Sequence, residues 1–255
     1  AITTPANVTM TAASSSGTGI AVTWEYALDA KTYVVYRKPT GTNNWAIIAR
    51  NVSGTSYTDK SVTAGESYTY TVRGVAADGR TMSKGYDAKG VTAKVPAAVL
   101  ASGSCGESVT WSLSSDGTLT LSGKGEMANY KSSDTAPYYN APWGSDALRL
   151  KIKRLVVNEG ITSIGDFAFY HCSNLTSVSL PNSLERIGNA VFFECSSLTS
   201  LVIPDNVTYI DSDLCTFCSS LETVKLPKWL LSCGGALFAS CTSLTSVVLP
   251  ENFNG

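Results

Sequence analysis

Charge, histidine and long apolar runs are all scarce in this 255-residue sequence. Charged residues make up 15% of the chain, and 20 acidic side chains nearly balance 19 basic ones, so the basic patch typical of a nucleic-acid surface is not expected. No apolar run reaches the roughly 18 residues that predict a membrane-spanning helix. The sole histidine, His171, restricts histidine-based catalysis or metal binding to one place. These shortages exclude several function classes before any motif is considered.

What the sequence does have is a repeat. Its clearest marker is a cysteine that recurs every 23 residues, at Cys172, Cys195, Cys218 and Cys241. Three apolar columns and a closing proline keep the same step, and an apolar but proline-free copy begins at Ile152. A fixed period of this length predicts a solenoid, in which each unit buries its apolar face against its neighbours.

One copy can be interpreted residue by residue. The pattern Leu175-x-x-Val178-x-Leu180 predicts a short strand with its apolar side chains inward, and Pro181 ends the strand because proline has no amide hydrogen to donate. The phenylalanine and cysteine of the following arc, Phe169 and Cys172 in the first copy, are expected to fill the other side of the coil. The four cysteines should therefore be buried free thiols, which pack as small hydrophobes.

The first 95 residues have a different pattern. Short runs that alternate apolar and polar residues are separated by turn signals, and residues 67–73 show a period of two throughout. About seven such strands predict a β-sandwich. The segment resembles a fibronectin type III domain, through Trp24 in the second strand, the tyrosines of the third, and Ala64–Val72. The resemblance implies a core role for Trp24, a corner hydrogen bond from Tyr68 to the backbone, and a spacer or adhesion module.

Residues 96–151 connect the two regions. Residues 96–103 are typical of a linker, and the runs 108–113 and 118–122 around Asp116-Gly117 predict a β-hairpin. We expect this hairpin to cover the first edge of the solenoid. The aromatic, proline-rich loop 137–144 allows two interpretations: a sugar-stacking platform, or, as we favour, a loop pinned by aromatic packing over the first repeat.

The repeats resemble the BspA-like subgroup of bacterial leucine-rich repeats, on the strength of residues 161–178 and of the lead-in from Cys105 to Trp143. The resemblance implies a right-handed coil on a secreted or surface-attached bacterial protein that contacts proteins or glycans, with no catalytic residues. The fold class predicted is thus mainly β: a fibronectin type III-like sandwich at 1–95, a linker and hairpin cap at 96–151, and 23-residue leucine-rich repeats at 152–255.

Several patterns suggest chemistry, and a structural explanation is favoured for each. Cys215-x-x-Cys218 spells a redox or zinc motif, but the register places both thiols in the core, as it does Cys233. His171 lies in a slot that tolerates very different residues, which is typical of a surface position. Asp205 and its acidic neighbours at 211 and 213 do not match a calcium loop, so a solvated acidic rim is expected. No cofactor, metal ion or catalytic group is expected.

Two functions remain. The first is a non-enzymatic adhesion or binding protein whose solenoid contacts a host or neighbouring-cell protein or a surface glycan. The second is a non-catalytic spacer or accessory part of a larger secreted, carbohydrate-active protein. The candidate contact residues are the outward strand positions, the aromatic departure from the repeat at 229 and the aromatic loop: Ser177, Ser179, Ser200, Val202, Thr223, Lys225, Ser246, Val248, Trp229, Tyr138, Tyr139 and Trp143.

Overall fold

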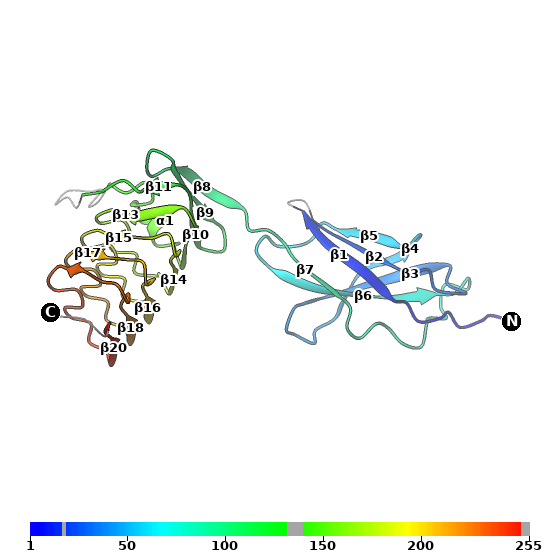
Figure 1. Ribbon diagram of the computed structural model, residues 1–255. Coiled ribbons are helices and arrows are strands. Elements are labelled where there is room, and N and C mark those ends of the chain that lie inside the picture. Colours follow the sequence, from blue (N-terminus) through cyan, green and yellow to red (C-terminus); the bar gives the residue numbers. More distant parts are fainter. Residues whose placement is uncertain (17–18, 132–139, 251–255) are drawn as a thin grey trace. The chain divides into compact units, whose positions relative to one another are not determined.

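A computed structural model describes residues 1–16, 19–131 and 140–250 of the chain. The chain divides into two compact units, residues 1–98 and 99–255, called here the sandwich and the repeat unit. Strands are the main regular secondary structure of both units (Figure 1), and the described residues contain one short helix, α1 (Asp146–Arg149), in the repeat unit. Among the described residues there is no helix with the length and apolar character needed to span a bilayer.

Two antiparallel sheets form the sandwich. The three-stranded sheet has the order β1-β2-β5, with β1 (Met10–Ser16), β2 (Gly19–Trp24) and β5 (Ser56–Asp59). The four-stranded sheet has the order β4-β3-β6-β7, with β3 (Thr32–Pro39), β4 (Ala46–Val52), β6 (Ser67–Val75) and β7 (Val91–Lys94). One buried cluster joins alternate residues of both sheets, such as Val22 from the first and Val35 and Val72 from the second. The period of two seen in the sequence therefore marks the inward face of each strand.

The two expectations for individual sandwich residues are confirmed. Trp24 is buried in the core, where its ring lies edge-on to Tyr33 with the centroids 5.4 Å apart. The amide of Thr63 donates a hydrogen bond of 3.2 Å to the hydroxyl of Tyr68, which ties the end of the preceding loop to β6. This bond is the corner that the Tyr68 position predicts.

An ion pair that the sequence did not reveal links the two sheets. The Asp59 carboxylate on β5 is fully buried and lies 2.8 Å from the Arg37 guanidinium on β3. It also accepts hydrogen bonds from the Tyr70 hydroxyl at 2.9 Å and from the amide and hydroxyl of Ser61. Burial raises the pKa of Asp59, but the hydrogen bonds from Ser61, Tyr70 and Arg37 outweigh it and hold the pKa below its ordinary value.

The repeat unit begins with a cap. Strand β9 (Val109–Ser114) pairs antiparallel with β10 (Thr118–Gly123), so the predicted hairpin is confirmed. β10 then pairs in parallel with the first strand of the coil, β12 (Arg154–Val157), and thereby covers that edge. The predicted linker 96–103 is too long, because Val99–Ser104 forms a further strand, β8, along the other side of β9.

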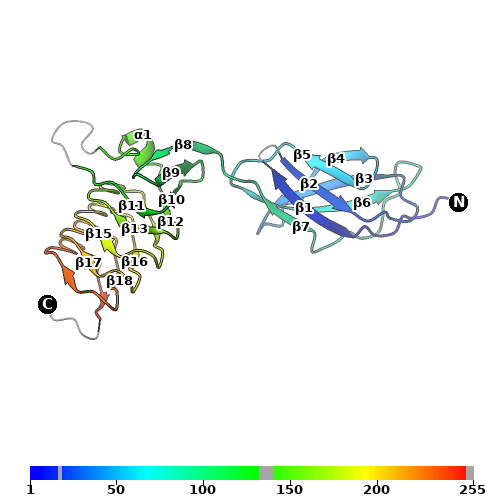
Figure 2. The ribbon, with the colours of Figure 1, turned by 45° about the horizontal axis from the view of Figure 1, so that its top comes forward.

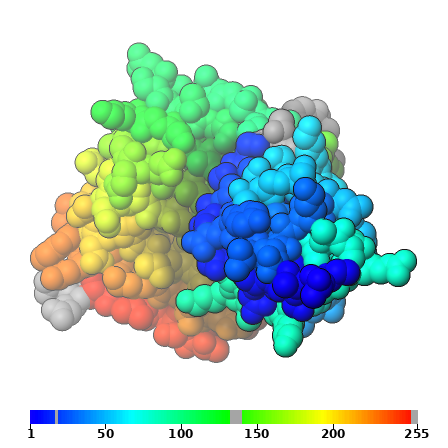
Figure 3. Space-filling model, turned by 90° about the vertical axis from the view of Figure 1, so that its right-hand side faces the viewer, coloured from blue at the N-terminus to red at the C-terminus, as the bar shows by residue number. Residues whose placement is uncertain are grey.

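The stacked coils of the solenoid align their short parallel strands into two ladders, which lie on opposite sides of the coil in Figures 1 and 2. The first ladder consists of β12 paired with β14 (Ser177–Ser179), followed by a separate three-stranded sheet of β16 (Ser200–Val202), β18 (Thr223–Lys225) and β20 (Ser246–Val248). The second consists of β11 (Gly125–Glu126), β13 (Ile161–Ile164), β15 (Arg186–Ile187), β17 (Tyr209–Ile210) and β19 (Ser232–Cys233). Paired residues of the coil strands are 23 residues apart, for example Leu201 with Val224, whereas β11 pairs with β13 at separations of 36 and 37 residues. Figure 3 shows the coils as successive bands of colour from green to red.

Columns of like side chains fill the coil. Phe169 and Phe192 stack with their ring centroids 5.6 Å apart, while the cysteines at 172, 195 and 218 are fully buried as expected. Each thiol of the next coil reaches back to a carbonyl of the coil before, as when Cys195 Sγ donates to the carbonyl of Phe169 at 3.3 Å. Cys233 and Cys241 are only half-buried, which corrects the expectation of full burial. Both belong to the last coil described, and no further coil among the described residues covers it.

Each arc that leads from the second ladder to the first contains left-handed residues that are not glycine. They form two columns 23 residues apart, one at 167, 190, 213 and 236 and the other at 171, 194, 217 and 240, with φ between 50° and 63°. Such a φ is uncommon for a residue that has a Cβ. The next coil holds these arcs in place through backbone hydrogen bonds such as that from the Phe167 amide to the Asn189 carbonyl at 2.8 Å. Stacking therefore enforces a backbone shape that the residue types alone do not favour.

Candidate ligand-binding surfaces

The strand face predicted from the repeat is exposed. On β14, β16, β18 and β20 the central residue faces the core and its two neighbours face solvent. Parallel pairing brings the outward residues into two rows. The first is small and polar, with Ser200, Thr223 and Ser246 side by side, and the second places Lys225 between Val202 and Val248. Ser177 and Ser179 are exposed in the same way on β14. The Lys225 ammonium lies 3.3 Å from an Asp205 carboxylate oxygen, so much of its charge is compensated.

Trp229, in the turn after β18, is accessible. Its side chain is 53% exposed, and the Lys228 ammonium lies 4.6 Å from its ring centroid. Neither the neighbouring coil nor its own turn hides the indole. A large exposed ring on a rigid turn is the kind of group that anchors a partner.

Trp143 was wrongly predicted as a contact residue. It is fully buried, stacks on Phe169 with centroids 5.6 Å apart, and donates from Nε1 to the carbonyl of Ala168 at 2.8 Å. Trp111 of the cap and Tyr130 meet it edge-on. The ring thus begins the column that Phe169 and Phe192 continue. The favoured interpretation of this loop, packing over the first repeat, holds for Trp143, whereas Tyr138 and Tyr139 lie outside the described residues.

A polar groove runs along the second ladder, and the sequence analysis missed it. Its volume is about 370 Å³, and it crosses β11, β13, β15 and β17. At its centre the Arg186 guanidinium lies 4.8 Å from the ring centroid of Tyr209, which is its partner on the adjacent strand. The polar residues that line the groove are Glu126, Asn129, Ser163, Asp166, Arg186, Tyr209 and Asp211.

The groove is more acidic than basic. Its lining contains three carboxylates and one guanidinium. One oxygen of Asp166 accepts from the Asn189 amide at 2.9 Å, and one oxygen of Asp211 accepts from the Ser212 amide at 2.7 Å, which fixes both side chains. The negative charge of Asp211 is the main cause that raises the pKa of the Tyr209 phenol, so this hydroxyl stays protonated. Fixed acceptors beside a neutral phenol suit a ligand rich in hydrogen-bond donors.

The floor of the groove needs a glycine. At Gly188 an added Cβ would lie 2.3 Å from an Asp166 carboxylate oxygen and 2.8 Å from the Asp166 amide nitrogen. Adjacent coils can approach this closely only where no side chain intervenes. A sequence signal for the groove was present: positions 163, 186, 209 and 232 share one outward register and include Arg186 and Tyr209. This signal is weak because the strands of this ladder are only two to four residues long.

The motifs that suggested chemistry have structural roles. Cys215 and Cys218 are fully buried, and burial raises the pKa of the Cys215 thiol well above its ordinary value, the opposite of a redox pair. His171 Nε2 lies 3.0 Å from a Glu194 carboxylate oxygen at the surface. Burial is the main cause that lowers the His171 pKa, with Glu194 acting in the opposite direction. In the described part of the chain no group of three or more His, Cys, Asp or Glu side chains could hold a metal ion.

Comparison with known proteins agrees with this architecture. Residues 148–255 match the BspA type leucine-rich repeat region in six copies. The resemblance of the repeats to this family is therefore confirmed for that part of the chain. No curated protein matches the sequence.

Three solved structures illustrate what the chain is similar to. A leucine-rich repeat protein from Eubacterium ventriosum is 23% identical over 58% of this chain and 44% of its own, with a TM-score of 0.43, so the chain spans less than half of that protein. An Fn3-like protein from Clostridium thermocellum is 26% identical over 38% of this chain and 95% of its own, with a TM-score of 0.29. A leucine rich cell surface protein from Faecalibacterium prausnitzii is 17% identical over 56% of this chain and 53% of its own, with a TM-score of 0.27.

Proposed function

We propose that this chain is a non-enzymatic binding protein, exported from a bacterium, whose solenoid contacts a protein or glycan at the cell surface. The BspA-type match supports a role in binding through the repeats, because stacked repeats offer long surfaces of regularly spaced side chains. The fibronectin type III-like sandwich, which precedes the solenoid in the sequence, would then act as a spacer or adhesion module. The cell-surface location is in keeping with the description of the Faecalibacterium prausnitzii protein.

The observation that carries the proposal is the groove along the second ladder. Arg186 and Tyr209 point outward from adjacent coils, contribute nothing to the apolar core, and hold a planar face together by a cation–π contact of 4.8 Å. The fixed carboxylates of Asp166 and Asp211 lie beside this face. Hydroxyl groups of a sugar, or amide and amine groups of a polypeptide, are the donors that these acceptors would satisfy.

The face of the first ladder is the competing surface. Its outward serines and threonine, with Lys225 and the exposed Trp229, form a flatter and less acidic strip. The groove is favoured because it is concave and because its polar side chains are held in place by hydrogen bonds to the backbone.

The test is a glycan array combined with a panel of matrix and cell-surface proteins, probed with the wild-type chain and two double variants. Arg186→Ala/Tyr209→Ala removes the planar face of the groove, and Lys225→Ala/Trp229→Ala removes the corresponding groups from the other ladder. We expect the first variant to weaken capture of the best ligand at least tenfold and the second to leave it nearly unchanged. Thermal unfolding of both variants serves as the folding control.

The outcomes separate the candidate functions. If Lys225→Ala/Trp229→Ala weakens capture and Arg186→Ala/Tyr209→Ala does not, the ligand binds the strand face around Trp229 instead of the groove. Absence of saturable binding to any member of both panels would contradict the binding proposal and favour the spacer or accessory function.

A further inference from the structure

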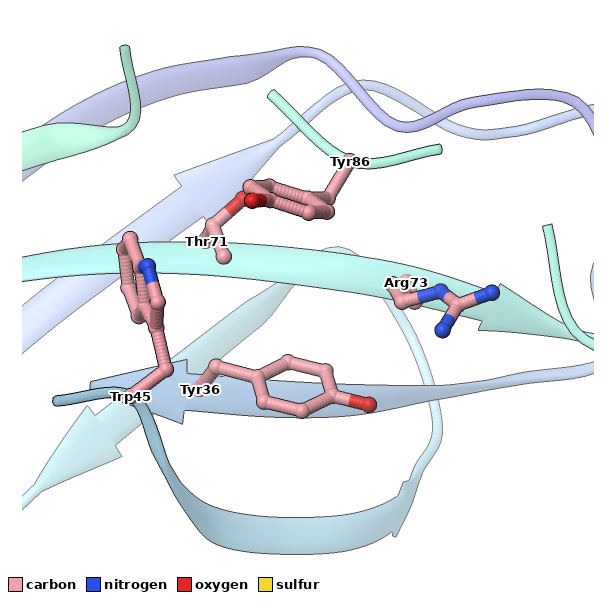
Figure 4. A pocket seen from close by; sticks show the side chains of 5 residues that line it. All are labelled: Tyr36, Trp45, Thr71, Arg73 and Tyr86. Carbon is pink, nitrogen blue, oxygen red and sulfur yellow. The ribbon is translucent and has the colours of Figure 1, made fainter. Parts of the chain in front are cut away.

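A second concave site lies on the sandwich, far in sequence from the repeats. It is a cleft of about 130 Å³ on the outer face of the four-stranded sheet, shown in Figure 4. Tyr36 of β3 and Thr71 of β6 are direct partners across the two central strands and both point outward. Trp45, just before β4, and Tyr86, in the loop before β7, stand over them, and Arg73 of β6 closes one end.

These side chains have no part in the core. Tyr36 and Thr71 are the sequence neighbours of inward-facing Val35 and Val72, and successive side chains of a strand point to opposite faces, so the strand period directs both away from the buried cluster. Tyr86 is 49% exposed, and the Trp45 and Tyr86 rings meet edge-on with centroids 6.2 Å apart. The three aromatic rings around this open cleft therefore do not serve to stabilise the core. Aromatic walls are typical of ligand sites.

The loop that supplies Tyr86 is anchored rather than loosely placed. The Thr71 hydroxyl donates to the carbonyl of Asp87 at 2.9 Å, and Arg73 Nε donates to the carbonyl of Ser83 at 3.0 Å. The Gly85 amide donates to the Asn7 side chain at 2.8 Å, which ties the loop to the start of the chain. Thr71 and Arg73 on one side of the cleft therefore hold in place the loop that carries Tyr86 on the other side, so the cleft is pre-formed.

The charge around the cleft is positive. Arg73 directs Nε and Nη2 to Ser83, which leaves Nη1 without a partner among the residues that the structure describes. The Lys38 ammonium lies 4.9 Å from the Trp45 ring centroid and adds a second positive charge. The nearby Asp87 carboxylate accepts hydrogen bonds from the amides of Met10, Lys89 and Gly90, and none of the described residues that line the cleft is acidic. This positive charge disfavours a cationic ligand. Aromatic cages that bind cations have no arginine in the site.

The size of the cleft limits what it can hold. Typical small-molecule pockets measure roughly 300–1,000 Å³, so a volume of about 130 Å³ accommodates one ring rather than a complete ligand. An open site for one ring is suited to a single unit of a polymer that continues beyond both ends. A proline-rich peptide advances about 9 Å per turn and docks across successive aromatic grooves, which one short cleft does not supply.

We propose that this cleft binds one acidic pyranose ring, of the uronic acid type, within a polysaccharide. The ring would pack its apolar face against Trp45 between the two tyrosines, and its carboxylate would accept from Arg73 Nη1. Arginine is favoured for such a contact because the guanidinium is planar and matches a carboxylate. The site is separate from the groove of the solenoid, and each can fail without the other.

The experiment titrates the full chain with an α-1,4-linked galacturonate trimer and with its methyl ester, followed by isothermal calorimetry at low and moderate salt. We expect the acidic trimer to bind at least tenfold more tightly than the ester, with an affinity that falls as salt increases because the contact with Arg73 is screened. Trp45→Ala should weaken binding of both sugars at least tenfold. Arg73→Gln should remove the preference for the acid, so that the acid and the ester bind with equal affinity.

Tyr26→Ala is the matched control, since Tyr26 is an exposed tyrosine of the sandwich that does not line the cleft. It should bind both sugars like the wild type, and thermal unfolding of all variants checks the fold. Equal affinity for acid and ester would overturn the proposal, as would loss of binding in the Tyr26 variant. Binding of a proline-rich decapeptide in place of either sugar would assign the cleft to a peptide instead.

Discussion

The two units of this chain place polar groups very differently. Of the five buried polar side chains among the described residues, four lie in the sandwich, at Asp59, Thr69, Thr71 and Ser83, and only Thr216 lies in the repeat unit. In the sandwich, Asp59 links the two sheets through hydrogen bonds from Arg37 and Tyr70, which lie 22 and 11 positions from it in the sequence. The solenoid is stabilised by columns of like apolar groups and thiols that repeat every 23 residues.

This difference determines how each unit responds to change. In the sandwich each buried position has its own partners, so one substitution removes one set of interactions. In the solenoid a buried residue belongs to a column, so its loss weakens the contacts of the coils on both sides. All seven cysteines lie at or after Cys105, which means that thiol labelling reports on the repeat unit alone.

The largest expected effect is at Asp59. Asp59→Asn removes the charge that pairs with Arg37 and leaves the guanidinium partly buried without an anion, at a cost of about 4 kcal/mol. Because the folded-state pKa of Asp59 is lowered, its carboxylate stabilises the sandwich fully above the unfolded-state pKa, near 4. That stabilisation is lost as the pH falls through the folded-state pKa. Hydrogen exchange of peptides from β3, β5 and β6 at pH 7 and pH 3 measures both effects, and the variant should be nearly independent of pH in this window.

Two controls confine this effect to the sandwich. Glu66→Gln alters an exposed acid and should change the unfolding free energy by less than about 0.5 kcal/mol. Thiol labelling of the repeat unit should be the same in the Asp59 variant and the wild type. Faster labelling in the variant would show that the two units do not unfold independently.

A somewhat smaller loss is expected inside the solenoid. Phe192→Ala opens a cavity in the column that Trp143 and Phe169 begin, and it should cost roughly 3 kcal/mol. The thiols of Cys172, Cys195 and Cys218 should then react sooner with a labelling reagent as denaturant is added. In the wild type they should stay unreactive, because burial raises the pKa of Cys172 to about 12 and that of Cys195 well above its ordinary value. Exchange in β3 and β6 of the sandwich should not change.

Phe238→Ala tests whether position in the column matters. Phe238 is the same residue type in the same register but is only partly buried, so the expected loss is about half as large. Equal losses at both positions would contradict the column description. In the native protein Cys233 and Cys241 should label before the other cysteines of the repeats.

The sequence predicted the solenoid well because the repeat states each structural constraint several times. Inward positions such as Leu201 and Val224 and the burial of Cys215 follow from register alone, and the hairpin cap follows from the alternating runs around Asp116-Gly117. The end of the described coils was predicted less well, because register gives the direction of the Cys233 side chain but not the presence of a covering coil. In the sandwich, the period of two indicated which residues face inward but not which of them meet.

The errors have a common physical origin. The pairing of Asp59 with Arg37 and the stacking of Trp143 on Phe169 both depend on elements that come together only in the folded chain. Composition marks Trp143 as an aromatic loop residue, which fits an exposed platform as well as a buried one. The outward register of Arg186 and Tyr209 follows from the 23-residue step, but the second ladder has shorter strands and therefore a weaker pattern in the sequence.

The smallest expected effect concerns the left-handed columns and has the opposite sign. Among the described residues of the sandwich, Asp29 and Asn51 are the left-handed ones that are not glycine, and both types tolerate this conformation. The solenoid columns mix tolerant types such as Asp213 with alanine and phenylalanine, for which it is uncommon. Ala236 has a φ of 54° and an exposed side chain, so Ala236→Gly relieves strain without opening a cavity. After the entropy cost of glycine, a gain of about 0.5 kcal/mol is expected.

Ala239→Gly is the matched control for that gain. Ala239 is an exposed alanine of the same coil with a negative φ, so glycine there adds flexibility and relieves nothing, which costs about 0.5–1 kcal/mol. Urea unfolding followed by labelling of Cys241 compares the two variants within a single coil. Opposite signs are expected, because only at position 236 does stacking of the coils impose the left-handed backbone. If both variants lose stability equally, the arcs carry no strain and the coils do not enforce their shape.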